Sequence, residues 1–314
     1  MRPAAELIGD DPGIRHIKER LVDLAPASIP VLISGETGTG KELAARALHD
    51  LSGREGPLVV VDCGALTPSL MEEELFGHER GAYTGAAGPR HGLLQEADKG
   101  TVLLDEIGEL PTELQTRLLR AIDRGTVRRI GSNRHTPIDV RFISSTNRDL
   151  LSEVVKGNFR RDLFFRLAGF TLSMPSLRER KDDIPRLLQH FMSEKEARRL
   201  SPQALQSLVA YDWPGNVREL QLFTERARLL VKHPVIVESD VRRLLLTDRP
   251  LRASIVPTDS VRLEDVREAA IKKALATTRG NVAEAAELLG IGRSTVYAWL
   301  STGRRRKDTQ GVKG

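Results

Sequence analysis

The segment GETGTGKE at residues 35–42 constrains this chain more than any other feature, because it lies between an apolar run and a helical pattern. The run at residues 31–34 predicts a buried strand, and small and apolar residues at 43, 44, 47 and 48 predict a helix. Glycines in such a loop let backbone N–H groups surround phosphate oxygens, and Lys41 supplies a positive charge to the terminal phosphates. This pattern predicts an ATP site. The predicted nucleotide ligands are Gly35, Glu36, Thr37, Gly38, Thr39, Gly40, Lys41 and Glu42.

A second motif, GTVLLDE at residues 100–106, places two carboxylates at the end of an apolar strand. There Asp105 can hold Mg²⁺ directly or through water, and Glu106 can polarise the water that attacks the phosphate. The Ser or Thr that usually follows the loop lysine and binds magnesium is replaced by Glu42. The two motifs together predict ATP hydrolysis, with Lys41, Asp105 and Glu106 as catalytic residues.

The arrangement of apolar runs predicts an α/β fold. Runs at residues 31–34, 58–61, 101–104 and 140–144 read as buried parallel strands, and residues 170–174 add a fifth. Helical patterns alternate with them, which favours a parallel sheet covered on both faces. We expect an α/β nucleotide-binding subdomain at residues 1–175, an all-α lid at 176–246, a linker at 247–260 and a DNA-binding domain at 261–314.

Composition and charge limit the remaining possibilities. With 40% hydrophobic and 29% charged residues, and no apolar run of about 18 residues, the chain is predicted to be globular, cytoplasmic and without a membrane partner. The single cysteine, Cys63, cannot form an internal disulfide and is expected to be buried. Residues 251–314 hold twelve Lys or Arg against seven Asp or Glu, so this end carries the whole net charge of +5. Such a basic end attracts a phosphate backbone.

Between the two nucleotide motifs lies ELFGHERGAYTGA, residues 74–86. It resembles the GAFTGA loop of the bacterial enhancer-binding proteins, the AAA+ activators that remodel RNA polymerase carrying sigma-54. A glycine-flanked ring and hydroxyl on a mobile insertion suit a contact that changes with nucleotide state. Tyr83 replaces the usual phenylalanine and keeps the ring. The resemblance implies a sigma-54 contact made by Gly81, Ala82, Tyr83, Thr84, Gly85 and Ala86.

The resemblance extends over nearly the entire chain and implies an AAA+ P-loop fold, since the family also carries glutamate after the lysine. STNRDL is similar to its first sensor, which implies that Thr146 and Asn147 report the terminal phosphate. NFRRDLFFRL is similar to the segment with its arginine fingers, which implies that Arg160 and Arg166 reach a neighbouring subunit's ATP. WPGNVREL is similar to the second sensor and implies that Arg218 lies near the nucleotide. Such fingers require a homo-oligomeric ring, and the family implies a hexamer.

At residue 62 the chain departs from the family, which usually has asparagine there. In the family, that asparagine holds the catalytic glutamate inactive until the partner binds. Asp62 cannot donate as an amide does, and it would repel Glu106 at short range. We therefore expect weaker coupling between partner binding and hydrolysis.

The C-terminal segment at residues 279–300 has the layout of a helix-turn-helix, with small residues in the first helix and a break at Gly290. It resembles the Fis-type module that ends many of these activators. Residues early on a recognition helix reach base edges in the major groove, and a following basic run binds phosphate. The predicted DNA contacts are Arg293, Ser294, Thr295, Tyr297, Arg304, Arg305 and Arg306.

These features predict an activator that binds upstream enhancer DNA and uses ATP and Mg²⁺ to remodel sigma-54 polymerase. One alternative is a regulator of ordinary promoters whose ATP site only controls oligomerisation. Another is a different remodelling ATPase, such as a chaperone or helicase loader, which has no obvious use for a terminal helix-turn-helix. Because the ATPase begins within about the first ten residues, we expect control by a regulatory protein in trans, by expression level or by a domain outside this sequence.

Overall fold

The computed structural model describes residues 7–83, 88–192 and 199–246, and, nearer the C-terminus, residues 271, 274, 275, 278 and 281–288. The chain divides into two units, residues 1–247 and 248–314. In the described part of the chain, no helix combines the length and the apolar character needed to cross a membrane.

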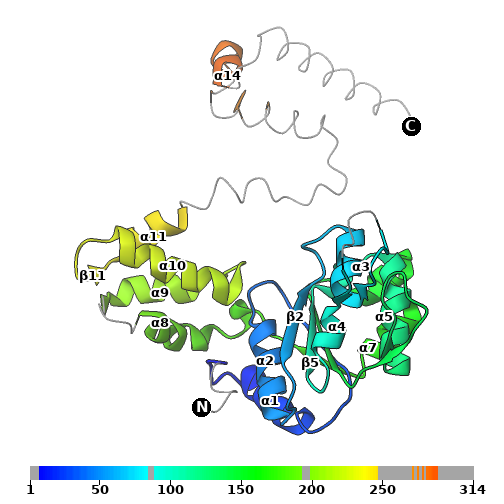
Figure 1. The fold of residues 1–314 in the computed structure, drawn as a ribbon. Coiled ribbons are helices and arrows are strands. Elements are labelled where there is room, and N and C mark those ends of the chain that lie inside the picture. Colours follow the sequence, from blue (N-terminus) through cyan, green and yellow to red (C-terminus); the bar gives the residue numbers. More distant parts are fainter. Residues whose placement is uncertain are drawn as a thin grey trace, which may run out of the picture. The chain divides into compact units, whose positions relative to one another are not determined.

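A parallel sheet forms the centre of the first unit, and its strands β2 and β5 are labelled in Figure 1. The strand order is β2-β5-β8-β1-β9. These strands are β1 (Val31–Ser34), β2 (Leu58–Asp62), β5 (Thr101–Asp105), β8 (Arg141–Thr146) and β9 (Phe170–Ser173). The predicted five-stranded parallel sheet is confirmed, with strand ends within two residues of the expected ones. The order brings β1, which precedes the phosphate loop, between β8 and β9.

Helices cover both faces of the sheet, as the uninterrupted apolar strands predict. On β5, Val102 and Leu104 join one core cluster and Leu103 joins the other, because successive side chains point to opposite faces. One core is completed by α1 (Pro12–Leu24) and α2 (Lys41–Leu51). The other is completed by α3 (Pro68–Phe76), α4 (Leu93–Glu96), α5 (Thr112–Arg124), α6 (Leu150–Lys156) and α7 (Arg161–Leu167).

Two short antiparallel pairs project from the second of these layers. The first joins β3 (Gly77–His78) and β4 (Arg90–His91), and the second joins β6 (Thr126–Val127) and β7 (Thr136–Pro137). Between β5 and α5 lies the 3₁₀ helix η2 (Ile107–Glu109). No periodic pattern predicted these pairs, because two residues are too few to show an alternation.

Helices dominate residues 177–246, which pack around their own core with Trp213 fully buried at its centre. The elements are η3 (Leu177–Glu179), η4 (Lys181–Asp183), α8 (Ile184–Met192), β10 (Arg199–Leu200), α9 (Pro202–Ala210), α10 (Asn216–Leu230), β11 (Val235–Ile236) and α11 (Glu238–Leu246). Ser201 caps α9, since its side chain accepts a hydrogen bond from the Ala204 N–H at 3.2 Å. The parallel pair β10–β11 was not predicted.

In the second unit, α14 (Val282–Leu288) lies within the first predicted helix of the helix-turn-helix. Asn281 caps it by accepting hydrogen bonds from the N–H groups of Ala283 and Glu284. Ala286 and Val282 pack with Ile271 and Leu275. The predicted recognition helix and its DNA-contact residues lie outside the described residues.

Candidate nucleotide site

The phosphate loop joins the carboxyl end of β1 to α2, and its backbone leaves donors free. Among the described residues, the N–H groups of Gly38, Gly40 and Lys41 have no acceptor. They lie at the N-terminus of α2, where the helix dipole also favours an anion. Gly38 has φ +81°, and a Cβ there would lie 2.4 Å from the Gly215 carbonyl oxygen, so only glycine fits. The loop therefore fits the phosphates of a nucleotide.

Lys41 points into the loop rather than into solvent, with its side chain only 7% exposed. Its Nζ donates to the Gly35 carbonyl oxygen at 2.9 Å and to that of Glu36 at 3.4 Å. It also lies 3.5 Å from Oε1 of Glu106. A buried ammonium needs acceptors of this kind, and phosphate oxygens are equivalent ligands.

The two predicted carboxylates stand side by side at the end of β5. Asp105 accepts a hydrogen bond from the Ser145 hydroxyl at 2.5 Å, a partner that the sequence did not predict. Glu106 has φ +49°, a left-handed conformation that is strained for a side-chain-bearing residue. This conformation places Glu106 beside Lys41 instead of continuing the strand.

Asn147 connects the loop to Glu106. Its side-chain amide donates to the Thr37 hydroxyl at 3.0 Å, and its backbone N–H donates to Oε2 of Glu106 at 3.0 Å. The neighbouring Thr146 accepts the Gly35 N–H through its carbonyl oxygen at 3.2 Å. The predicted sensor segment therefore contacts both nucleotide motifs.

The lid meets the loop through Asn216, which is fully buried. Its amide donates to the Thr37 carbonyl oxygen at 3.0 Å and to Oε2 of Glu36 at 3.1 Å, while its Oδ1 accepts the Leu177 N–H at 2.7 Å. Arg178 forms a bidentate pair with Glu36. The hydrogen bond from Arg178, together with that from Asn216, lowers the pKa of the Glu36 carboxyl.

Sequence reasoning singled out neither Arg178 nor Asn216. Arg178 is 142 positions from Glu36, and nothing local indicates the pairing. Asn216 lies within WPGNVREL, the segment that is similar to the second sensor, and only Arg218 of that segment was predicted to lie near the nucleotide. Arg218 itself is exposed, its backbone N–H lies 3.4 Å from the Gly38 carbonyl oxygen, and its Cβ lies 3.0 Å from a Cβ built at Gly38.

The structure does not bring Arg160 and Arg166 to this site. Both are exposed at the ends of α7, and each pairs with a carboxylate of its own chain. Arg160 binds Asp162 at 2.7 Å, and Nε of Arg166 lies 2.8 Å from Asp123. Within the described residues, neither guanidinium contacts the phosphate loop.

Asp62 lies at the end of the edge strand β2, opposite Asp105 in the sheet register. Its Oδ1 accepts the Gly64 N–H at 2.9 Å, and in the described part of the chain it makes no hydrogen bond to Glu106. Cys63 is buried, as expected, and burial together with Asp62 and Asp105 raises the pKa of its thiol.

Gly81, Ala82 and Tyr83 of the GAYTGA segment are described, whereas Thr84, Gly85 and Ala86 lie outside the described residues. The Tyr83 ring is 43% exposed and makes an edge contact with His78, with ring centroids 5.3 Å apart. A hydrogen bond to Glu73 raises the pKa of the Tyr83 hydroxyl.

A metal at this site would depend on the nucleotide. No three His, Cys, Asp or Glu side chains gather as a metal site in the part of the chain that the structure describes. Mg²⁺ in nucleotide enzymes usually takes one or two carboxylates together with phosphates and water. Asp105, oriented by Ser145 at the mouth of the loop, fits that donor set.

Three family models match the chain in succession. Residues 7–173 match the Sigma-54 interaction domain, residues 178–254 the AAA+ ATPase lid domain, and residues 262–300 the bacterial regulatory proteins of the Fis family. The succession follows the predicted order of an α/β subdomain, a lid and a DNA-binding module.

Individual relatives and solved structures are also similar to this chain over most of its length. The transcriptional regulatory protein ZraR of Klebsiella oxytoca is 46% identical over 309 residues, covering 95% of this chain and 70% of ZraR. The response regulator protein PilR of Pseudomonas aeruginosa is 41% identical over 299 residues, covering 91% and 66%. The crystal structure of NtrX from Brucella abortus with ADP superposes with a TM-score of 0.71 at 31% identity, covering 94% of this chain and 68% of NtrX.

Proposed function

We propose, from the premise that this chain belongs to the family of sigma-54-dependent transcriptional activators, that it couples ATP hydrolysis to remodelling of sigma-54 RNA polymerase. The chain is an AAA+ ATPase with a nucleotide-binding domain and a Fis-type DNA-binding module. One observation carries the proposal: a continuous network of hydrogen bonds through Thr37 and Asn147 joins the phosphate loop, Glu106 and the lid, so a change at the γ-phosphate would reach all three. The sigma-54 interaction domain disfavours both alternatives, an ordinary-promoter regulator and an unrelated remodelling ATPase.

Hydrolysis would proceed at the end of β5. Lys41 would exchange its carbonyl acceptors for phosphate oxygens and offset their charge. Asp105 would hold Mg²⁺, which when bound neutralises charge on the phosphates. Glu106 would turn from Lys41 to the attacking water and orient it or accept its proton.

The sensors would report the state of the nucleotide. Asn147 contacts both Thr37 and Glu106, so a γ-phosphate between them would compete for its amide. Asn216 and Arg178 connect the phosphate loop to the lid. Arg218, which lies on α10 together with Asn216, would add a positive charge near the nucleotide. Loss of the γ-phosphate would then change the position of the lid and the position of the phosphate loop together.

A ring is required if Arg160 and Arg166 act as fingers, since neither contacts its own phosphate loop within the described residues. Each would leave its aspartate and bind the ATP of a neighbouring subunit, with a hexamer as the family's implied size.

The C-terminal module would bind double-stranded enhancer DNA in the cytoplasm. Arg293, Ser294, Thr295 and Tyr297 would read bases, while Arg304, Arg305 and Arg306 would bind phosphates.

Replacing Thr84 with alanine tests the proposed contact between the GAYTGA segment and sigma-54 polymerase. Removing the Thr84 hydroxyl is expected to lower ATP-dependent open-complex formation with sigma-54 polymerase by about 5–150-fold, because coupling energies of about 1–3 kcal/mol are typical. ATP hydrolysis should stay unchanged, since Thr84 is not among the residues assigned to the nucleotide site. Thr84→Ser keeps the hydroxyl and should retain promoter opening. Equal opening by wild type and Thr84→Ala would refute the assigned contact.

Replacing Asp62 with asparagine tests the departure from the family. An amide can donate to the carboxylate of Glu106 and restrain it, which an aspartate cannot do. We expect lower basal ATP hydrolysis and a larger stimulation by sigma-54 polymerase. Asp23→Asn on α1 makes the same charge change at an exposed position. Asp62 has no part in coupling if Asp62→Asn leaves both rates as they are.

A further inference from the structure

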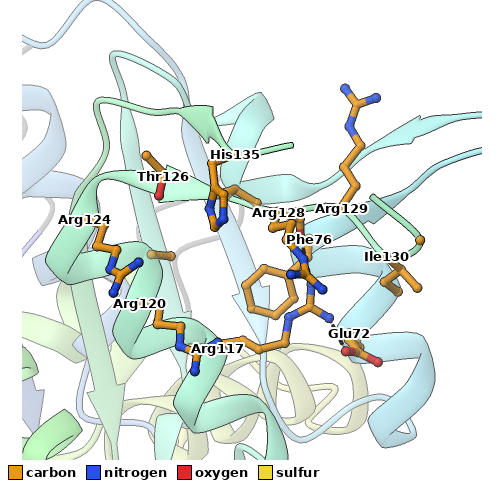
Figure 2. Close-up of a pocket in the computed structure, with 13 residues that line it drawn as sticks. Glu72, Phe76, Arg117, Arg120, Arg124, Thr126, Arg128, Arg129, Ile130 and His135 are labelled. Atoms are coloured by element: carbon orange, nitrogen blue, oxygen red, sulfur yellow. Dashed lines mark hydrogen bonds and ion pairs between the residues drawn. The ribbon is translucent and has the colours of Figure 1, made fainter. Parts of the chain in front are cut away.

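A hollow of about 590 Å³ lies away from the nucleotide site, between α3, α5 and the β6–β7 hairpin (Figure 2). Its volume is within the range of about 300–1,000 Å³ that small-molecule sites occupy. Five arginines and one carboxylate are among its lining residues. The charged lining residues are Glu72, Arg117, Arg120, Arg124, Arg128 and Arg129.

The arginines come from two elements that face each other. Arg117, Arg120 and Arg124 are spaced by three and four residues on α5 and so share one helix face, while Arg128 and Arg129 follow β6. Like charges at such spacing repel and destabilise a helix unless anions compensate them.

Two of the five arginines are compensated within the chain. Arg117 forms an ion pair with Glu72, donates to the Arg128 carbonyl oxygen at 2.7 Å and lies 4.2 Å over the Phe76 ring. Arg129 donates to Gln95 at 3.0 Å and lies 3.2 Å from Glu79. In Figure 2 its guanidinium points away from the other arginines.

The other three are not compensated. The side chains of Arg120, Arg124 and Arg128 are exposed and make no hydrogen bond or ion pair with any residue that the structure describes. All three border the same hollow, together with the exposed His135. The concave arrangement of these guanidinium groups is complementary to an anion, since the one carboxylate among the described lining residues, Glu72, is already paired with Arg117.

We propose that this hollow, the arginine pocket, binds a compact anion with two or more phosphate groups, such as a nucleoside polyphosphate or inorganic polyphosphate. Guanidinium forks bind phosphate oxygens in pairs, and several converging forks favour several phosphates. Phe76 is buried beneath Arg117 and offers no face to a base, so the phosphates supply the recognition. A nucleic-acid backbone is less suitable, because the arginines surround a hollow instead of following an extended stripe.

The occupant would act on the GAYTGA segment. The Ile130 N–H donates to the Gly77 carbonyl oxygen at 2.9 Å, and the Glu79 N–H donates to the Ile130 carbonyl oxygen at 3.0 Å. The hairpin that carries Arg128 is therefore bonded to β3, which leads into Gly81. An anion that joins α5 to this hairpin would stiffen the base of the segment without touching Lys41.

The test measures binding of inorganic tripolyphosphate by calorimetry to the full chain carrying Lys41→Ala, so that the phosphate loop contributes little. Adding Arg120→Gln and Arg124→Gln is expected to weaken this binding at least about tenfold, because two charge-assisted contacts are lost. Arg15→Gln with Arg228→Gln, both exposed on α1 and α10, removes the same charge elsewhere and should leave binding unchanged. Arg128→Gln, on the opposite wall, provides a second variant.

Four results would overturn the proposal. Binding of tripolyphosphate could be unaffected by every pocket variant. It could also fall equally in the control pair, which would indicate that the net positive charge of the chain, and not the pocket, attracts the anion. A short DNA duplex could depend on these arginines while tripolyphosphate does not, which would make the hollow a contact for a nucleic-acid backbone. Finally, the pocket variants could fail only to assemble, which would make acidic side chains of a second copy the occupant.

Discussion

Glu106→Gln is expected to lower ATP turnover by about 10²–10⁴-fold, the usual contribution of a positioned acid or base. Glutamine keeps the shape and can still accept the Asn147 N–H, but it cannot take a proton from water. Nucleotide binding should persist or tighten, because the variant removes a negative charge 3.5 Å from Lys41. Steady-state phosphate release and binding of a fluorescent ATP analogue measure the two effects separately.

Two further variants serve as controls for Glu106→Gln. Glu109→Gln, three residues further on in η2, loses an exposed carboxylate that pairs with Arg148 and should keep nearly full turnover. Lys41→Ala should lose nucleotide binding as well as turnover. Retention of more than half the wild-type turnover by Glu106→Gln would remove Glu106 from the mechanism.

Arg160→Ala and Arg166→Ala are each expected to lower turnover by about 10³-fold, in the range reported for arginine fingers. The decisive measurement mixes Arg166→Ala subunits with Lys41→Ala subunits. Each variant is inactive alone, but in a mixed ring an intact loop of the first lies beside an intact finger of the second. Turnover should therefore recover in the mixture, and sedimentation should report the ring.

Arg161→Ala is the matched control, since Arg161 lies between the two candidates on α7 and only covers the Phe165 ring at 5.7 Å. It should change turnover little. A mixture no more active than its separate components would mean that Arg166 acts inside its own subunit, through its pair with Asp123. The same mixture made with Arg160→Ala decides this for Arg160 and its pair with Asp162. The ring would then lose its main support.

Local pattern predicted much of the nucleotide site because its parts are short and locally encoded. The loop from Gly35 to Lys41 needs glycines in sequence, and the carboxylates at 105 and 106 follow an apolar strand that parallel pairing brings to the same edge as the loop. The lid contacts could not be predicted in this way. Leu177 and Asn216 meet only because two separate helical segments pack together.

The sequence by itself determined the strands, the phosphate loop, the pair of carboxylates at the end of β5 and, through resemblance, the family, because backbone conformation and periodicity act over a few neighbouring residues. Tertiary structure alone decided that Glu106 turns toward Lys41. It also decided that Asn147 connects the phosphate loop to Glu106 and that Asn216 connects this loop to the lid. Finally, it left three arginines of the arginine pocket without a partner in the described chain. Those outcomes depend on which distant side chains compete for the same donors and acceptors, and only the packed fold sets those distances.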